Sequence, residues 1–81
     1  MRLDKFLKVS RLIKRRTVAK DACEGGKVSL NNKVAKPGSE VNIGDIIEIA
    51  YGDRKLKAEV IGINEKVMKD EAKEMYRILE S

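Results

Sequence analysis

The hydrophobic period of the sequence changes at the glycine pair Gly25-Gly26, and this change constrains the fold more than any other feature. Apolar residues before the pair recur every three or four positions, as on one face of a helix. After the pair they alternate with polar residues, as in a strand with one buried face. Glycine closes a helix in the left-handed conformation at little cost. The chain is therefore predicted to be an α+β protein in which N-terminal helices precede a sheet.

Two short helices are predicted before the glycine pair. The first runs from Arg2 to about Ser10, along an apolar stripe spaced i, i+3, i+4, i+7. The second begins within a turn of Arg15 and ends at Glu24. Two rows of small apolar residues at i, i+4 spacing would let it pack closely against the first helix. The stripe is Leu3, Phe6, Leu7 and Ser10; the rows are Val18/Ala22 and Ala19/Cys23.

The chain after the glycines is predicted to form a small antiparallel sheet. Turn signals separate its apolar stretches at Asn31-Asn32, Gly44-Asp45 and Gly52-Asp53, and Pro37-Gly38 interrupts the chain between the first two. The strands expected around these turns cover residues 28–30, continuing at 34, and residues 46–51 and 56–60. The last of these shows the cleanest alternation of apolar and charged side chains.

A helix is predicted again over residues 69–80. Its apolar stripe has helical spacing, and we interpret it as core packing rather than a groove for a partner. No repeat, low-complexity tract or linker divides the chain, so residues 1–81 are predicted to form a single domain. Its core would lie in residues 1–50, with a strand hairpin and the terminal helix in residues 51–81. The stripe consists of Ala72, Met75, Tyr76 and Leu79.

Composition argues against most catalytic chemistry. The chain has no histidine and one cysteine, Cys23, which excludes His- and Cys-based zinc sites and Ser–His or Cys–His nucleophilic pairs. Cys23 lies on an apolar row and is interpreted as a core residue. Gly25-Gly26-Lys27 lacks the spacing of a phosphate loop. We therefore expect a protein that is not an enzyme and has no metal or cofactor. Without a membrane-length apolar run or a signal peptide, it is expected to be cytoplasmic. We also expect a monomer.

The positive charge is concentrated at one end of the chain. Residues 1–20 hold eight basic residues and one acidic residue, a local charge of +7, whereas the remainder holds ten basic and twelve acidic residues. Such segregation favours a polyanion as partner, since Lys and Arg release counterions when they bind phosphates. Few aromatic residues are available to stack on splayed bases, so structured RNA is the predicted ligand.

Several motifs resemble one family. They are Arg2-Leu-Asp-Lys-Phe-Leu7, Lys14-Arg-Arg-Thr-Val-Ala19, Glu24-Gly-Gly-Lys-Val28, Asn31-Asn32 and Ile43-Gly-Asp45. Together they resemble the RNA-binding domain named after small-subunit ribosomal protein four, the S4 domain. The resemblance implies an S4-like (αL-motif) fold: two N-terminal helices packed on a small antiparallel sheet, here with a C-terminal helix added.

Among stand-alone members, the opening residues 1–17 are most similar to the ribosome quality control protein P (RqcP-like) family. The chain also resembles the fifteen-kilodalton heat-shock ribosome-recycling protein, whose longer basic tail has no counterpart after Ser81. The first resemblance implies binding to large ribosomal subunits that carry a stalled peptidyl-tRNA. There, family members hold the P-site tRNA against large-subunit rRNA while an RqcH-type factor adds untemplated alanines. The implied partners are therefore large-subunit rRNA, peptidyl-tRNA, the large subunit and that tailing factor.

The resemblance and the charge pattern together imply the RNA-binding residues. Arg16 is the strongest candidate, because it matches a basic family position and can bind a phosphate with two N–H groups at once. Asp4, the one acidic residue among these cations, is expected to orient a basic side chain. Two positions depart from the family: Arg15 stands where relatives often have Thr or Ser, and Asn32 stands where the turn usually has Gly. The predicted contacts are Arg2, Lys5, Lys8, Arg11, Lys14, Arg15 and Arg16, with Lys20, Lys27 and Asn32 further out.

Three other functions remain open from the sequence. The first is the recycling role of the heat-shock relative. The second is the RNA-targeting domain of an rRNA-modifying enzyme such as a pseudouridine synthase, for which 81 residues leave no catalytic domain. The third is an interaction protein that binds a protein partner through its terminal helix.

Overall fold

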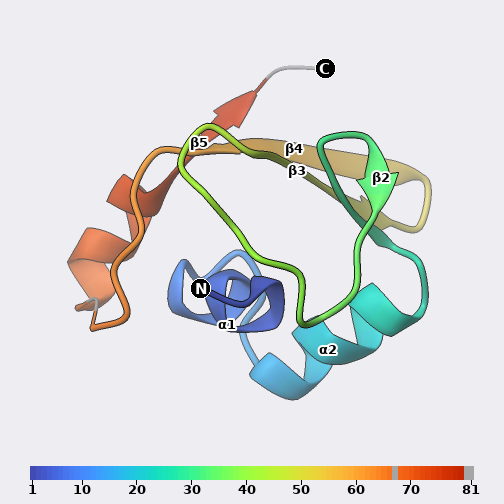
Figure 1. Ribbon diagram of the computed structural model, residues 1–81, viewed down its shortest axis with the longest axis horizontal. Helices are drawn as coiled ribbons and strands as arrows, with labels where there is room; N and C mark the ends of the chain where they lie inside the picture. Colours follow the sequence, from blue (N-terminus) through green and yellow to red (C-terminus); the bar gives the residue numbers. More distant parts are fainter. Residues whose placement is uncertain (67, 80–81) are drawn as a thin grey trace.

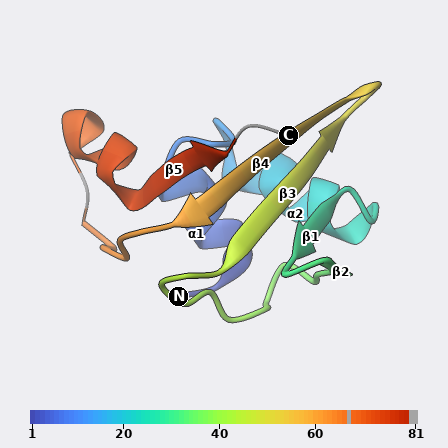
Figure 2. The same ribbon diagram turned by 90° about the horizontal axis from the view of Figure 1, so that it is seen from above.

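The computed structural model describes residues 1–66 and 68–79 and contains helical and strand elements in mixed order. The N-terminal helices are separated from a 3-10 helix, η1, by four strands, and a fifth strand follows η1. Both α-helices lie on the same side of the sheet (Figures 1 and 2). The bounds are α1 Leu3–Val9, α2 Arg16–Glu24, β1 Val28–Leu30, β2 Lys33–Val34, β3 Ile46–Tyr51, β4 Arg54–Val60, η1 Lys69–Met75 and β5 Tyr76–Leu79.

The sheet has five strands in the order β2-β1-β3-β4-β5, and every neighbouring pair is antiparallel. The register places Ile47 of β3 opposite Ala58 of β4, and both side chains are buried. Successive strand residues point to opposite faces, so the residues that alternate with these buried ones along each strand carry the charged groups of the open face. The alternation predicted from the sequence is therefore confirmed, and one face of the sheet packs on the helices.

The apolar stripe of α1 fills the centre of the core. Leu3, Phe6 and Leu7 are completely buried, and Ser10 at the end of the stripe is 1% exposed. Its hydroxyl donates to the carbonyl of Leu7 at 3.3 Å. Ala19 and Cys23 of α2 are also buried, whereas the neighbouring row is half-buried at Ala22 and exposed at Val18. The Ala19/Cys23 row thus packs as predicted, and the Val18/Ala22 row lies largely toward solvent.

A connecting segment between β2 and β3 runs beside the N-terminus (Figure 1). The N–H groups of Leu3 and Asp4 donate to the carbonyls of Ser39 (2.8 Å) and Pro37 (3.1 Å). Val41 in turn donates to the carbonyl of Met1 at 2.9 Å. The first N–H groups of a helix have no acceptor within the helix. Here this segment supplies carbonyl acceptors for two of these N–H groups. The start of α1, and with it Arg2, is consequently fixed by main-chain bonds.

The predicted turns form with the backbone conformations their residues favour. Asn31 and Asn32 have φ values of 53° and 69°, in the left-handed region that asparagine tolerates. The Asn31 side chain also bonds the sheet, since its Oδ1 accepts the N–H of Ile46 at 2.9 Å. At the end of α2, Gly26 is the left-handed residue, with a φ of 73°. These features confirm the helix end and the β1–β2 turn.

The predicted helix over residues 69–80 is wrong in its second half. Residues Lys69–Met75 form a 3-10 helix in which Ala72 and Met75 are buried, so this part of the stripe does belong to the core. At Tyr76 the backbone becomes extended and pairs with β4, Val60 lying opposite Tyr76. Without this pairing the outer edge of β4 would keep free backbone groups. The prediction for Glu80 lies outside the described residues.

Met75 should contribute far more to stability than Met68. Met75 is 2% exposed and its carbonyl accepts the N–H of Ile61 at 3.0 Å, whereas Met68 is 70% exposed. We expect Met75→Ala to lower the free energy of unfolding by about 2–5 kcal/mol, because a buried methionine leaves a cavity. Met68→Ala, the matched control, should change it by less than about 0.5 kcal/mol. Urea unfolding measures both; equal effects would mean that the segment does not belong to the core.

Candidate nucleic-acid interface

A buried carboxylate organises the N-terminal cations. Asp4 lies in the first turn of α1, and its side chain is 4% exposed. Its Oδ1 accepts the N–H of Lys5 at 2.8 Å and the Nε–H of Arg2 at 3.2 Å. Its Oδ2 lies 3.4 Å from Nη2 of Arg2 and 3.5 Å from Nε of Arg16. Two arginines, one from the start of each helix, therefore converge on a single carboxylate.

The two arginines keep part of their guanidinium groups accessible. Their side chains are 55% and 47% exposed, although each contacts Asp4. They line a shallow hollow of about 350 Å³ together with Asp4, Thr17 and Lys20. Three cations and one carboxylate leave this hollow with a net charge of +2. A guanidinium that is held in place by a carboxylate can still present its remaining N–H donors to a phosphate.

The α1–α2 connection makes a tight corner that exposes further cations. Arg11 has a φ of 64° and donates to the carbonyl of Lys8 at 3.0 Å. Ile13, which follows closely, is 6% exposed and donates to the carbonyl of Leu7. This buried residue fixes the loop from below, so the charged side chains on either side of it point to solvent. Those exposed cations are Arg11, Lys14 and Arg15.

The other predicted site residues lie outside the cluster around Asp4. Lys5 is half-buried and its Nζ donates to Glu65 at 3.2 Å, which links α1 to the segment after β4. Lys8 is exposed in the last turn of α1. Lys27 follows α2, and Asn32 lies in the β1–β2 turn; both are exposed. The structure therefore gathers Arg2, Asp4, Arg16 and Lys20 and spreads the remaining residues over the surface.

Tyr51 is a surface residue that the sequence reasoning did not include in the site. Its hydroxyl donates to the carbonyl of Leu12 at 3.2 Å, so the ring lies against the basic α1–α2 connection. The residue is 46% exposed, and its partial burial raises the pKa of the phenol above its usual value. The available signal was its position at the end of a strand, directly before the turn residues Gly52-Asp53. A residue at a hairpin tip often leaves the core.

The thiol of Cys23 is chemically quiet. Burial, together with the negative charges of Asp4 and Glu24, raises its pKa from 9.0 to about 11. A thiol with this pKa holds little of the reactive thiolate near neutral pH. Across residues 1–66 and 68–79, no group of three potential metal ligands comes together. In the same residues, no helix is both long and apolar enough to cross a membrane.

Comparison with known proteins identifies the family. The model of the S4 domain matches residues 1–47, which contain both helices, β1, β2 and the whole Asp4 cluster. The chain belongs to the S4 domain family. This confirms the resemblance found in the sequence and the predicted α+β fold, apart from the terminal helix.

Related proteins and one solved structure extend the similarity beyond that domain. A protein of Halalkalibacterium halodurans named RQC P-site tRNA stabilizing factor is 50% identical over 78 residues, which cover 96% of this chain and 89% of the relative. A Listeria innocua protein of the same name is 51% identical and covers 98% and 86%. The trimeric structure of Vibrio cholerae heat shock protein 15 superposes with a TM-score of 0.88 at 35% identity, covering 98% of this chain and 81% of that one.

Proposed function

We propose that this protein is a non-enzymatic RNA-binding factor of bacterial ribosome quality control in the cytoplasm. It binds large ribosomal subunits that carry a stalled peptidyl-tRNA, and it holds the P-site tRNA against large-subunit rRNA. Its relatives of about 50% identity are named for stabilising a P-site tRNA. The finer step is retention of the tRNA while an RqcH-type factor adds alanines to the stalled chain.

The observation that carries the proposal is the convergence of Arg2 and Arg16 on the buried carboxylate of Asp4. An arginine on a protein surface samples many rotamers, so holding its side chain in one of them costs conformational entropy. Here the carboxylate holds two guanidinium groups in place before RNA arrives. The main-chain bonds of the 37–41 segment also fix the backbone around Arg2. Such preorganisation favours a ligand of defined shape, such as a folded RNA, over a flexible polyanion.

The remaining cations supply contacts that depend little on sequence. The α1–α2 connection presents Arg11, Lys14 and Arg15, and Lys8 lies beside it on α1. Phosphates bound by these groups would release counterions and position the protein on its particle. Lys5, Lys20, Lys27 and Asn32 complete the proposed surface. No residue in this mechanism forms or breaks a covalent bond; the protein acts by placement.

Replacing Arg16 should weaken binding and its dependence on salt. With about five phosphate contacts, log affinity for purified large subunits should fall against log salt with a slope of about −4. Arg16→Ala should weaken binding about tenfold and reduce the slope by about 1, because one phosphate contact is lost. Sedimentation of subunits with bound protein at 50 to 200 mM salt, roughly the range where such contacts respond, measures both.

Arg77→Ala is the matched control. Arg77 lies on the open face of the sheet, opposite Glu59, with which it forms an ion pair. The control removes the same charge at a position outside the proposed site, so its affinity and salt slope should stay at the wild-type values. If Arg16→Ala and Arg77→Ala bound alike, net charge rather than the Asp4 cluster would explain binding.

Replacing Asp4 tests preorganisation against simple charge. Asp4→Asn makes the protein more positive, and charge alone would then strengthen RNA binding. We expect about fivefold weaker binding instead, about 1 kcal/mol, since both arginines lose the carboxylate that holds them. Asp21→Asn adds the same charge at an exposed site on α2 and should leave affinity unchanged or slightly higher. Tighter binding by Asp4→Asn, with an unchanged melting temperature, would contradict the proposed site.

The structural similarity to heat shock protein 15 supports a second candidate, ribosome recycling by a protein of the same fold. The two roles differ in their product. If the protein acts in tailing, a strain lacking its gene should lose untemplated alanine tails on stalled chains, detected by immunoblot of a stalling reporter. Normal tails with an accumulation of obstructed large subunits would support recycling instead.

A further inference from the structure

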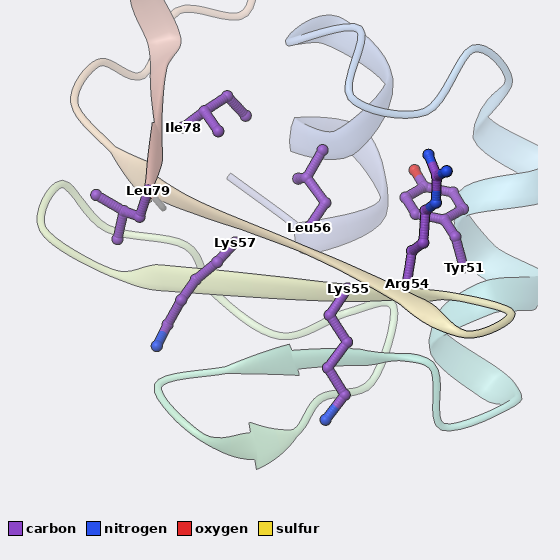
Figure 3. A pocket seen from close by; sticks show the side chains of 7 residues that line it. All are labelled: Tyr51, Arg54, Lys55, Leu56, Lys57, Ile78 and Leu79. Atoms are coloured by element: carbon purple, nitrogen blue, oxygen red, sulfur yellow. The ribbon is translucent and has the colours of Figure 1, made fainter. Parts of the chain in front are cut away.

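A second hollow lies where β5 ends beside β4. It has a volume of about 440 Å³ and a mainly apolar lining. In Figure 3 the side chains of Tyr51, Arg54, Leu56 and Ile78 point to one side of the sheet, whereas Lys55 and Lys57 point to the other. The first side is the one that carries the helices, and the ribbon of α1 lies beyond Leu56 (Figure 3).

The hollow lies along β4, beside the described end of β5. Among the described residues, β5 pairs with positions 57–60 of β4, and positions 54–56 have neighbours only in β3. The side chains around this gap remain accessible, with Ile78 52% exposed and Tyr51 46% exposed. A contiguous patch of exposed aromatic and aliphatic groups on a small domain marks a binding surface more often than single exposed residues do.

This hollow continues the basic surface. The hydroxyl of Tyr51 bonds the carbonyl of Leu12, in the loop that presents Arg11, Lys14 and Arg15. Arg54 is the cross-strand partner of Tyr51, and the two side chains lie together in Figure 3. An RNA strand whose phosphates contact the loop would therefore meet an aromatic ring that is held in place, a guanidinium beside it and an apolar protein surface.

We propose that the hollow receives one unpaired nucleotide of the bound RNA. Its base stacks on the ring of Tyr51 and lies over Leu56 and Ile78, and its phosphate pairs with Arg54. The inference rests on the proposed function, since it adds a contact to the same RNA. Bulged or looped bases in folded RNA are read in this way, by stacking on aromatic groups next to a cation. The charge around the hollow is positive, which suits a nucleotide and repels a basic protein segment.

Two substitutions of Tyr51 separate the ring from its hydroxyl. Tyr51→Leu removes stacking and should weaken binding to purified large subunits about tenfold. Tyr51→Phe keeps the ring and should stay within about twofold of the wild type. The salt slope of Tyr51→Leu should equal that of the wild type, because stacking releases no counterions. Tyr76→Leu is the control at a tyrosine of β5 outside the hollow, and thermal melting checks that each variant folds.

Crosslinking identifies what occupies the hollow. Wild-type protein bound to large subunits is irradiated at a wavelength absorbed by bases and digested, and the peptide ending at Arg54 is examined by mass spectrometry. A nucleotide adduct on Tyr51 is the expected result. Nucleotide adducts confined to other peptides would overturn the proposal, as would wild-type affinity of Tyr51→Leu. In either case a loss of binding by Arg16→Ala would leave the proposed function intact, whereas its absence would refute both.

Discussion

The buried carboxylate of Asp4 is the interaction on which the candidate site depends. A charged group this far from water is tolerated only when cations and hydrogen-bond donors surround it. Asp4 obtains both from Arg2, Arg16 and the N–H of Lys5. The interaction also joins the starts of the two helices, so fold and site share one contact. Loss of the carboxylate would release the arginines and loosen the contact between α1 and α2.

Much of the fold could be predicted because local signals agreed with global packing. The stripe of α1, the turn at Asn31-Asn32 and the alternation in β4 each have one reading that buries apolar groups and satisfies the backbone. The tail was mispredicted because Tyr76 and Leu79 continue a helical stripe, whereas in the strand they lie on opposite faces of the sheet. The free outer edge of β4 decided between them, and an edge formed by a distant strand is not visible in a local pattern.

The candidate site could likewise be predicted only in those features that depend on local sequence. Charge segregation predicted which end of the chain is basic, since a count of residues suffices for that. It could not rank those residues, because Lys5 and Arg2 look alike in the sequence, yet one pairs with Glu65 and the other with Asp4. Nor could it place Tyr51 beside the α1–α2 connection, since that neighbourhood depends on how the β3–β4 hairpin meets the loop. The family supplied a set of residues, and the geometry singled out a few of them.

The backbone at Arg11 shows what this surface costs the protein. Among the described residues, the other non-glycine positions with positive φ are Asn31 and Asn32, which tolerate that region, whereas a long side chain there is strained by about 1 kcal/mol. Glycine would relieve the strain and remove a cation from the loop. Folded proteins are stabilised by only about 5–15 kcal/mol in total, so a strain of this size is a substantial cost. At this corner the backbone conformation disfavours a long side chain, yet the residue present is a cation exposed to solvent.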